Sequence, residues 1–235
     1  MGFTFKQFHI EQDQCAMKVG TDGVLLGSWA NGGEHILDIG TGTGLLALMM
    51  AQRFEKSLID AIEIEENAYQ QAVQNVAKSV FKSKINIIHS SLQNFAKSNI
   101  NQYDSIICNP PYFVNSLKNN KKSKTIARHN DTLPFNELIS LAYKLLKTEG
   151  TLSLVLPVNI FPLIETEAVI YGFFLNRKIS IKTTEKKQPK RVLVEYKKEP
   201  TQIETSTEYL LNQNGEKSIW YQQLTNIFYL SLIHI

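Results

Sequence analysis

The segment YDSIICNPPYF, from Tyr103 to Phe113, ends an apolar run with an asparagine, two prolines and two aromatic residues. The Asn109 side-chain oxygen and the Pro110 carbonyl could each accept one N–H of a planar amine, and so turn its lone pair towards an electrophilic methyl group. Both hydrogen bonds would strengthen as positive charge develops on the attacking nitrogen. Tyr112 and Phe113 offer rings on which a base could stack. The segment therefore predicts methyl transfer to an amine, and the alternative is a proline-stiffened exit from a sheet.

A second candidate site is the turn DIGTGTG at residues 38–44. Gly40 and Gly42 favour a nucleoside cofactor, because glycines let a ligand approach the backbone and the helix that follows offers its N-terminus. The dinucleotide fingerprint G-x-G-x-x-G fits poorly, because a count that starts at Gly40 finds Leu45 where the fingerprint has its last glycine. Counting from Gly42 puts Ala47 there, an accepted variant, so a nicotinamide cofactor stays a weaker alternative. The plainest alternative is a turn that serves only helix packing.

Two carboxylates accompany this turn. Glu63 ends the next apolar run, 23 positions after Gly40, and a carboxylate at about that spacing can accept both ribose hydroxyl hydrogens. Glu65 and Glu66 compete for that role, and a solvated acid at the end of a strand is the structural alternative. Asp38 could help to hold the turn and could meet an ammonium group. A methionine moiety therefore suits this turn better than a pyrophosphate, which Asp38 would repel.

Apolar runs alternate with helical patterns from residue 35 to residue 175. This alternation predicts a parallel, doubly wound Rossmann-like sheet, in which ligands bind beyond the carboxyl ends of the strands. Two alternating runs around Gln188 and Pro189 predict an antiparallel hairpin at 178–198, which would bring the sheet to seven strands. The expected strands are 35–40, 57–64, 84–89, 103–108 and 151–157, and the expected helices are 45–54, 66–79, 134–147 (capped by Gly150) and 160–174.

The chain is interpreted as a single α/β domain, which its 235 residues suit. Residues 35–200 would form the domain itself, and residues 1–34 an N-terminal segment that packs on it. Residues 201–235 would be an extension on the same domain, with a strand followed by a helix.

Positive charge is concentrated in two segments, although the net charge of the chain is only +3. Residues 114–130 carry five basic side chains and no acid, and residues 176–200 carry nine basic side chains and three acids. The rest of the chain is acidic overall, and this distribution suits a nucleic-acid footprint. Two solvated loops are an equally weighted alternative. The side chains expected to bind RNA are Phe113, Lys121, Lys122, Lys124, Arg128, His129, Lys190 and Arg191.

The sequence does not indicate a metal site or a membrane segment. No CxxC or HxxxH spacing occurs, and no apolar run reaches about 18 residues. The N-terminus lacks the apolar segment of a secretory signal. Cys15 and Cys108 are the only cysteines and lie far apart, which is typical of reduced thiols in a cytosol. We therefore expect a cytoplasmic protein without metal, and assume a monomer.

Together, DIGTGTG, Glu63 and NPPY resemble class I S-adenosylmethionine-dependent methyltransferases that act on amines. NPPY alone is shared by enzymes that methylate adenine in DNA, guanine in ribosomal RNA or glutamine in proteins. The flanking segments are more specific, and they resemble bacterial tRNA methyltransferases that make N6-methyladenine beside the anticodon of a valine tRNA. These segments are FKQFHIEQDQCAMKVGTDGVLLGSWA (5–30), TIARHNDTLPFNELI (125–139), QPKRVLVEY (188–196) and YQQLTNIFYL (221–230).

This resemblance implies S-adenosyl-L-methionine as cofactor and adenine 37 of a tRNA as substrate. It implies that residues 18–23 lie over the cofactor, and that residues 109–112 hold the adenine. In such enzymes an acidic residue follows the third strand, but Ser91 stands there, and its weaker acceptor would make the Leu92 backbone N–H more important. The cofactor-binding residues expected are Lys18, Thr21 (near the methionine end), Asp38, Gly40, Gly42, Glu63 (on the ribose), Ile64, Ser91, Leu92 and Asn109.

Other functions stay open at this point. A protein glutamine N5-methyltransferase would share NPPY, but resembles enzymes with a sizeable helical domain before the glycine turn, where only 37 residues precede Asp38 here. Methylation of another RNA base amine would use the same residues. A non-catalytic RNA-binding protein would keep the fold, although the intact Gly40, Gly42, Glu63 and Asn109 argue against it.

Overall fold

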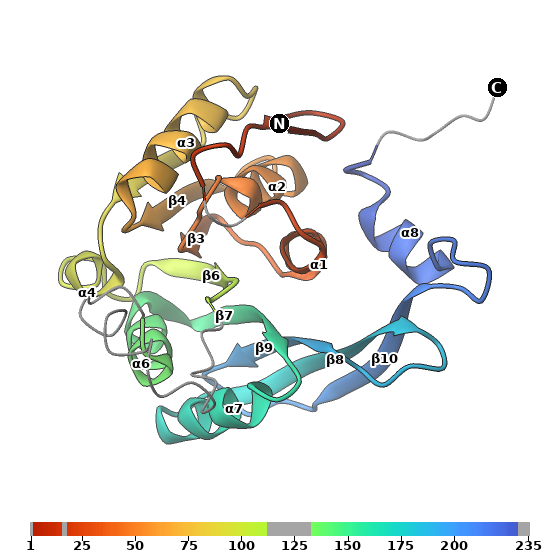
Figure 1. Cartoon of the computed structure of the whole chain (residues 1–235). Coiled ribbons are helices and arrows are strands. Elements are labelled where there is room, and N and C mark those ends of the chain that lie inside the picture. The colour runs from red at the N-terminus through yellow and green to blue at the C-terminus, as the bar shows by residue number, and fades with distance from the viewer. Residues whose placement is uncertain (1, 16–17, 112–132, 230–235) are drawn as a thin grey trace, which may run out of the picture.

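The computed structural model describes residues 2–15, 18–111 and 133–229 (Figure 1). Its main sheet has eight strands, in the order β10-β8-β9-β7-β6-β3-β4-β5. In chain order these strands are β3 (His35–Ile39), β4 (Leu58–Glu63), β5 (Ile85–His89), β6 (Tyr103–Cys108), β7 (Leu146–Pro157), β8 (Phe174–Thr184), β9 (Arg191–Lys197) and β10 (Glu204–Leu211). A separate pair is formed by β1 (Phe3–Thr4) and β2 (His9–Ile10).

The five strands from β7 to β5 are parallel, and the central strands β3, β4 and β6 are largely apolar, because both of their faces are covered. The chain builds outward from β3 through β4 to β5, and then returns to place β6 on the other side of β3. The topological switch point therefore lies between β3 and β6. The prediction of a parallel, doubly wound sheet is confirmed.

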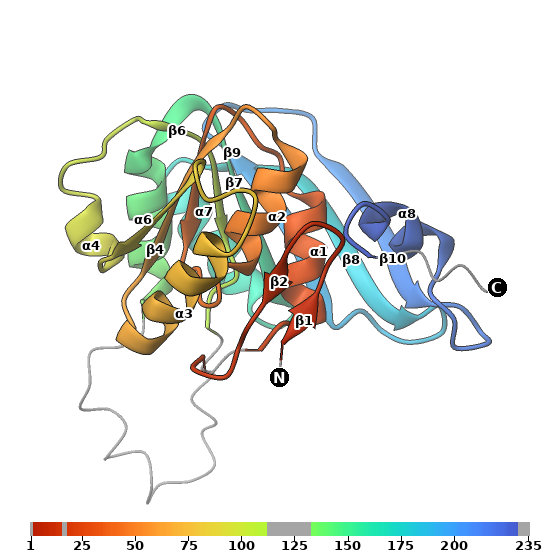
Figure 2. The same cartoon turned by 90° about the horizontal axis from the view of Figure 1, so that it is seen from above.

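Helices cover both faces of the sheet and bury one apolar core on each side (Figure 1). One core packs under α1 (Thr21–Trp29), α2 (Leu45–Arg53), α3 (Glu66–Ala77) and α8 (Ile219–Thr225). The other packs under α4 (Leu92–Phe95), α6 (Phe135–Leu145) and α7 (Phe161–Ile170). The β1–β2 hairpin lies against the first of these faces, where Phe5, Phe8 and Ile10 are buried (Figure 2). No helix of the described ranges is long and apolar enough to cross a membrane.

The hairpin predicted at 178–198 is present as β8 and β9, which pair antiparallel, and β9 also pairs antiparallel with β7. The strand and helix expected within residues 201–235 are present as β10 and α8, but the expected count of seven strands is wrong by one, because β10 joins the sheet by pairing in parallel with β8. Its sequence, ETSTEYLL, is exposed over its first half and carries no continuous apolar run. Such an edge strand gives a weak signal in the sequence.

The expected helix cap at Gly150 is also wrong. Helix α6 ends at Leu145, and β7 begins at the next residue. Gly150 lies within β7, next to an irregular register with β6. A Cβ there would lie 2.9 Å from the Tyr103 carbonyl oxygen and 2.8 Å from Leu146 Cδ2, so this glycine permits a close approach of two strands.

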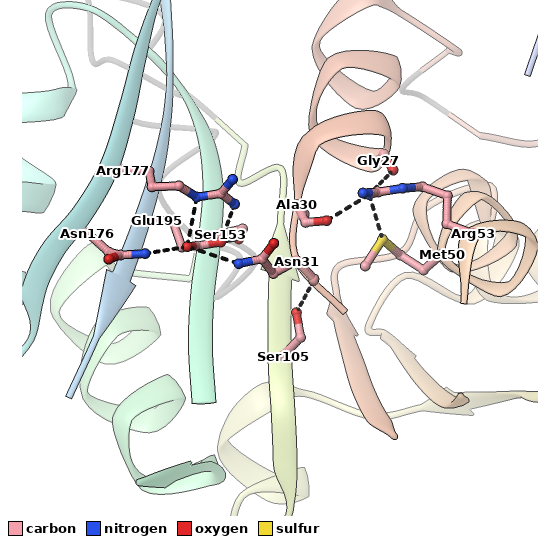
Figure 3. Close-up of polar contacts among 10 residues, drawn as sticks. All are labelled: Gly27, Ala30, Asn31, Met50, Arg53, Ser105, Ser153, Asn176, Arg177 and Glu195. Carbon is pink, nitrogen blue, oxygen red and sulfur yellow. Dashed lines mark hydrogen bonds and ion pairs between the residues drawn. The ribbon is translucent and has the colours of Figure 1, made fainter. Parts of the chain in front are cut away.

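A buried polar cluster fixes the hairpin against the segment that follows α1 (Figure 3). Glu195 is fully buried, and its two carboxylate oxygens accept from Arg177 Nε at 3.0 Å and Nη2 at 2.7 Å. Asn176 and Asn31 also donate to it. A second arginine, Arg53, donates to the Gly27 and Ala30 carbonyls, and so supplies hydrogen-bond donors to the carbonyl groups at the C-terminal end of α1. These contacts hold α1 in place at that end.

Candidate functional site

The glycine turn and the Asn-Pro-Pro segment follow two neighbouring strands. In the register of the sheet, Ile39 lies opposite Cys108, so Gly40 and Asn109 leave the sheet side by side. Neighbouring strands are about 4.8 Å apart, and both exits flank the switch point. Glu63 ends β4 on the other side of β3. The structure therefore gathers the three predicted features at one edge.

The glycine turn has a backbone that favours glycine. Gly40 and Gly42 have φ angles of 70° and 58°, in the left-handed region. The N–H groups of Gly40 and Thr41 both donate to the Ile62 carbonyl at 3.0 Å, which fixes the turn on β4. A Cβ on Gly40 would meet no atom of the described residues within 4 Å, so open space lies beside this glycine.

Asp38 is fully buried behind the turn. Its Oδ2 accepts from Thr41 Oγ1 at 2.6 Å and from the Ala47 N–H at 3.2 Å, which confirms that Asp38 holds the turn. Its Oδ1 has no hydrogen-bond partner among the described residues. Burial raises the pKa of Asp38 from 3.8 to about 7, against the lowering effect of its two hydrogen bonds. A cation delivered to this carboxylate would lower its pKa again.

Glu63 connects the glycine turn to the exit of β4. Its Oε2 accepts from the Gly42 N–H at 2.8 Å, and its Oε1 accepts from the Ile64 and Glu65 N–H groups at 2.9 and 3.0 Å. A carboxylate offers about four acceptor positions. One position on Oε2 therefore remains for a ligand hydroxyl. Glu63 is nearly buried, at 8% exposure, which strengthens such a bond.

The two competing acids have other roles in the structure. Glu65 caps α3, where it accepts from the Ala68 N–H at 2.7 Å and the Asn67 N–H at 3.2 Å. These backbone bonds lower the pKa of Glu65. Glu66 lies 3.2 Å from His89 Nδ1. Glu63 is thus the acid that faces the glycine turn.

The N-terminal segment is tied to this turn by two residues that the sequence analysis missed. Asn75 of α3 donates to the Thr43 and Glu11 carbonyls, and accepts the Glu11 N–H. Gln71, one turn earlier, accepts the Gln14 N–H at 3.1 Å. Both side chains are 1% exposed. Two polar residues spaced i, i+4 on an otherwise apolar helix face are the signal that could have revealed them.

The same segment reaches over the glycine turn. A Cβ on Gly42 would lie 3.9 Å from Cys15 Sγ. Farther along, Gln12 accepts the Val19 N–H at 2.7 Å, and its carbonyl accepts from Lys18 Nζ. Thr21 is the first residue of α1. These contacts tie Lys18 to the segment that passes Gly42, and the ion pair of the adjacent Asp22 with Arg191 places Thr21 at the carboxyl ends of the strands.

At the end of β6, Asn109 is half-buried and Pro110 is buried. Burial raises the pKa of the neighbouring Cys108 thiol, with smaller effects from Asp38 and Glu63, so this thiol stays protonated. Cys108 is therefore a core residue. The other predicted residues of this region lie outside the described residues, namely Tyr112, Phe113, Lys121, Lys122, Lys124, Arg128 and His129.

Ile64 and Ser91 lie just beyond the carboxyl ends of β4 and β5, at the same edge of the sheet as the glycine turn. Ser91 Oγ accepts the Asn94 N–H at 3.2 Å and caps the short helix α4, so its hydroxyl already serves the fold. Leu92 is buried beside it. Ile64 directly follows Glu63 and exposes 52% of its surface. An exposed apolar side chain beside a carboxylate that can accept from a hydroxyl suits contact with a flat ring.

Lys190 and Arg191 lie at the same edge, where Arg191 pairs with Pro157 at the end of β7. Lys190 is exposed, whereas the Arg191 guanidinium forms an ion pair with Asp22 of α1. Within the described ranges, no group of three His, Cys, Asp or Glu side chains could hold a metal ion.

A cleft of about 1100 Å³ lies at the opposite edge of the sheet. Its lining includes Arg53, Asp104 and Lys147, near the amino ends of the strands. Lys147 and Asp104 pair at 2.7 Å across it, which leaves little unbalanced charge. The cleft contains none of the residues gathered at the glycine turn.

The site thus offers open space at Gly40, an acceptor position on Glu63, an unpartnered buried oxygen on Asp38 and an exposed apolar Ile64. These groups fit a nucleoside that carries hydroxyls, a flat ring and an amino-acid tail. S-adenosyl-L-methionine has all of these parts.

Comparison with known proteins agrees with this geometry. The family model described as the methyltransferase small domain matches residues 20–162. A protein of Aliivibrio salmonicida is 42% identical over 98% of both chains, and one of Pseudoalteromonas translucida is 43% identical over 98% of this chain and 99% of its own. A protein of Bacteroides thetaiotaomicron is 41% identical over 98% of both chains. All three are named "tRNA1(Val) (adenine(37)-N6)-methyltransferase".

Solved structures show the same fold at low identity. A predicted O-methyltransferase from Agrobacterium tumefaciens has a TM-score of 0.69 and 17% identity, and the match covers 88% of this chain and 96% of that one. TYW2 from Pyrococcus horikoshii, solved with MeSAdo, has a TM-score of 0.59 and 15% identity, over 85% of this chain and 72% of its own.

Proposed function

The chain belongs to the tRNA1(Val) (adenine(37)-N6)-methyltransferase family, and on this premise we propose that it methylates N6 of adenine 37 in a valine tRNA. It is an S-adenosyl-L-methionine-dependent methyltransferase of the α/β Rossmann-like class. One observation carries the proposed chemistry: the glycine turn after β3 and the Asn-Pro-Pro segment after β6 leave neighbouring strands at the switch point.

For the cofactor, we assign the ribose to the remaining acceptor position of Glu63 and the adenine ring to the exposed face of Ile64. Asp38 keeps the glycine turn in shape, and its unpartnered oxygen favours a nearby ammonium group. Gly40 and Gly42 leave the backbone accessible to the amino-acid tail. Lys18 and Thr21 lie in the segment that closes this side of the site. The bound cofactor supplies the electrophilic methyl group.

For the target base, the Asn109 side-chain oxygen and the Pro110 carbonyl accept the two N–H groups of the adenine amine. This geometry directs the nitrogen lone pair towards the methyl donor. Positive charge on the nitrogen strengthens both bonds in the transition state, so they bind it more tightly than the ground state. Tyr112 would stack on the extruded base. The amine loses its proton after transfer, so no general base is required.

Ser91 is assigned a weaker role in adenine binding than the acid usually found there. Because its hydroxyl oxygen caps α4, the Leu92 N–H is the group we expect to meet the cofactor adenine. The same proposal assigns the protein to the cytoplasm, where tRNA is modified and where the thiols of Cys15 and Cys108 would stay reduced.

The experiment that tests this function is nucleoside mass spectrometry of a valine tRNA incubated with the protein and S-adenosyl-L-methionine. The expected product is N6-methyladenine, located at position 37 by fragment mapping. A methylated guanine would instead favour another RNA amine. Methyl transfer to a glutamine of a protein release factor, with none to tRNA, would replace the proposal by a protein methyltransferase.

A further inference from the structure

We propose that the turn between β8 and β9 binds the phosphate backbone of the tRNA stem next to the loop that is methylated. The lysines assigned are Lys186, Lys187 and Lys190. This inference rests on the proposed function, because it takes tRNA as the substrate. It adds two residues to the RNA-binding set and separates Arg191 from that set.

The position of the turn carries the first step. β9 begins at Arg191, opposite Pro157, the last residue of β7. The Lys190 carbonyl also accepts the Val158 N–H, so Lys190 lies directly beyond the carboxyl end of β7. β7 is the neighbour of β6, whose exit carries Asn109. The turn is therefore on the same edge of the sheet as the methyl-transfer site.

The distance along this edge follows from the strand order, β6-β7-β9-β8. Strands are about 4.8 Å apart, so β9 and β8 are displaced sideways from β6 by roughly 10 and 14 Å, and both reach beyond the level of Cys108 along the strand direction. Figure 2 shows β8 and β10 at the side of the sheet that lies away from β4. We therefore assign to this part of the edge the stem that adjoins a base held at Asn109.

The charge state of the turn carries the second step. Lys186, Lys187 and Lys190 are all exposed, and none takes part in an ion pair among the described residues. Glu185, the acidic residue of the turn, lies beside the connection between β10 and α8, where its Oε2 is 3.4 Å from Gln213 Nε2. These three lysines, which have no ion-pair partner among the described residues, therefore lie together at the edge of the sheet that carries Asn109.

Arg191 differs from these lysines although it is their neighbour in sequence. Its Nε donates to Asp22 Oδ2 at 2.7 Å, and Nη1 donates to the Lys190 carbonyl. Asp22 lies in the first turn of α1, next to Thr21. A cation matched by an acid attracts phosphate less than an unmatched one. We therefore assign Arg191 to the positioning of α1 beside the cofactor site, and not to the binding of RNA.

The chemistry of the turn indicates backbone contacts instead of base contacts. Its sequence, EKKQPK, contains no aromatic ring on which a base could stack. Lysine is a point charge that neutralises phosphate without reading sequence. Stems are bound mainly through their phosphates and shape, whereas loops are read through splayed bases. The turn suits the stem, and the Asn-Pro-Pro segment suits the loop.

The test is the salt dependence of tRNA binding, measured as the dissociation constant at several salt concentrations with S-adenosylhomocysteine present. Each phosphate contact contributes about 0.7 to 0.9 to the slope of log affinity against log salt. The triple variant Lys186→Gln, Lys187→Gln, Lys190→Gln should lower that slope by about 2. The dissociation constant of S-adenosylhomocysteine, measured by calorimetry, should not change, which also shows that the variant is folded.

A matched control keeps the same change of net charge. Lys56, Lys78 and Lys82 are exposed and precede or follow elements at the opposite edge, so their Gln triple should keep the wild-type slope. Equal slopes for the two triples, or a slope of the first that matches wild type, would overturn the inference. A wild-type protein that binds tRNA with the expected slopes but does not methylate it would defeat the proposed function alone. Absence of any tRNA binding would defeat both.

Discussion

Arg191 Nε lies 2.7 Å from Asp22 Oδ2 and so joins the first residue of β9 to the first turn of α1. The opposite end of α1 is held by Arg53, which donates to the Gly27 and Ala30 carbonyls. The helix that presents Thr21 to the site is therefore fixed at both ends by arginines from other elements. If Thr21 binds the cofactor as proposed, Asp22 and Arg191 are positioning residues for it.

Loss of the Asp22–Arg191 pair should weaken cofactor binding modestly. The side chains are 25% and 37% exposed, and partly exposed pairs contribute about 0.2–1 kcal/mol. Asp22→Asn and Arg191→Gln should each raise the dissociation constant of S-adenosylhomocysteine by about two- to five-fold, as measured by calorimetry. Arg191→Lys should retain part of the affinity. A lower salt slope of tRNA binding in Arg191→Gln, with cofactor binding intact, would return Arg191 to the RNA surface.

The buried Asp38 should make the unliganded protein less stable as pH rises. Its pKa is about 7 in the folded state and near 3.8 when unfolded, so between these values the folded state holds a proton that the unfolded state has lost. The free energy of unfolding therefore decreases as pH increases from about 4 to about 7, by a few kcal/mol at most. Denaturant unfolding of wild type and Asp38→Asn across this range measures it, and the variant should lack this part of the slope. Parallel curves for the two proteins would contradict the assignment.

The same carboxyl should link cofactor binding to pH. An ammonium group favours the ionised form of Asp38, so binding should release a proton below about pH 7. The affinity for S-adenosylhomocysteine should then rise between pH 6 and pH 7.5 in wild type and stay flatter in Asp38→Asn. Calorimetry in buffers of different ionisation enthalpy counts the released protons. Equal proton release in both proteins would show that another group titrates.

Glu63→Gln should damage both the fold of the turn and cofactor binding. The three N–H groups that Glu63 accepts would face an amide with a single oxygen and an NH2 that cannot accept. We expect at least a ten-fold loss of cofactor affinity and a lower melting temperature, since an unmatched buried donor costs about 1–3 kcal/mol. Glu66→Gln, at an exposed acid three residues on, is the control and should leave both quantities nearly unchanged.

The sequence was informative wherever a local pattern decided the structure. DIGTGTG and NPPY each mark the end of a buried strand, and alternation of strands and helices predicted that the two ends meet at one edge. The i, i+4 spacing of Gln71 and Asn75 could mark them as unusual, but their partners could not be read in this way, because these lie 57 and 64 positions away. The Asp22–Arg191 pair spans 169 positions, so only the packed sheet brings it together.

Two local predictions failed for a physical reason of the same kind. Gly150 suggested a helix cap, but the demand for a glycine comes from the Tyr103 carbonyl on the neighbouring strand. A strand was expected within residues 201–235, but not its place in the main sheet, because an edge strand is half solvated and its place is set by pairing with β8. In both cases a contact distant in sequence decided the local structure.

The central claim, that Asn109 holds the reacting amine, is tested most directly by single-turnover methyl transfer to a valine tRNA. With saturating S-adenosyl-L-methionine, Asn109→Ala should lower the rate at least a hundred-fold, the magnitude of losing one transition-state hydrogen bond of this kind. Binding of S-adenosylhomocysteine should fall far less, and Asn86→Ala, on β5 beside Asp60, should keep the wild-type rate. A rate within about three-fold of wild type for Asn109→Ala would contradict the account.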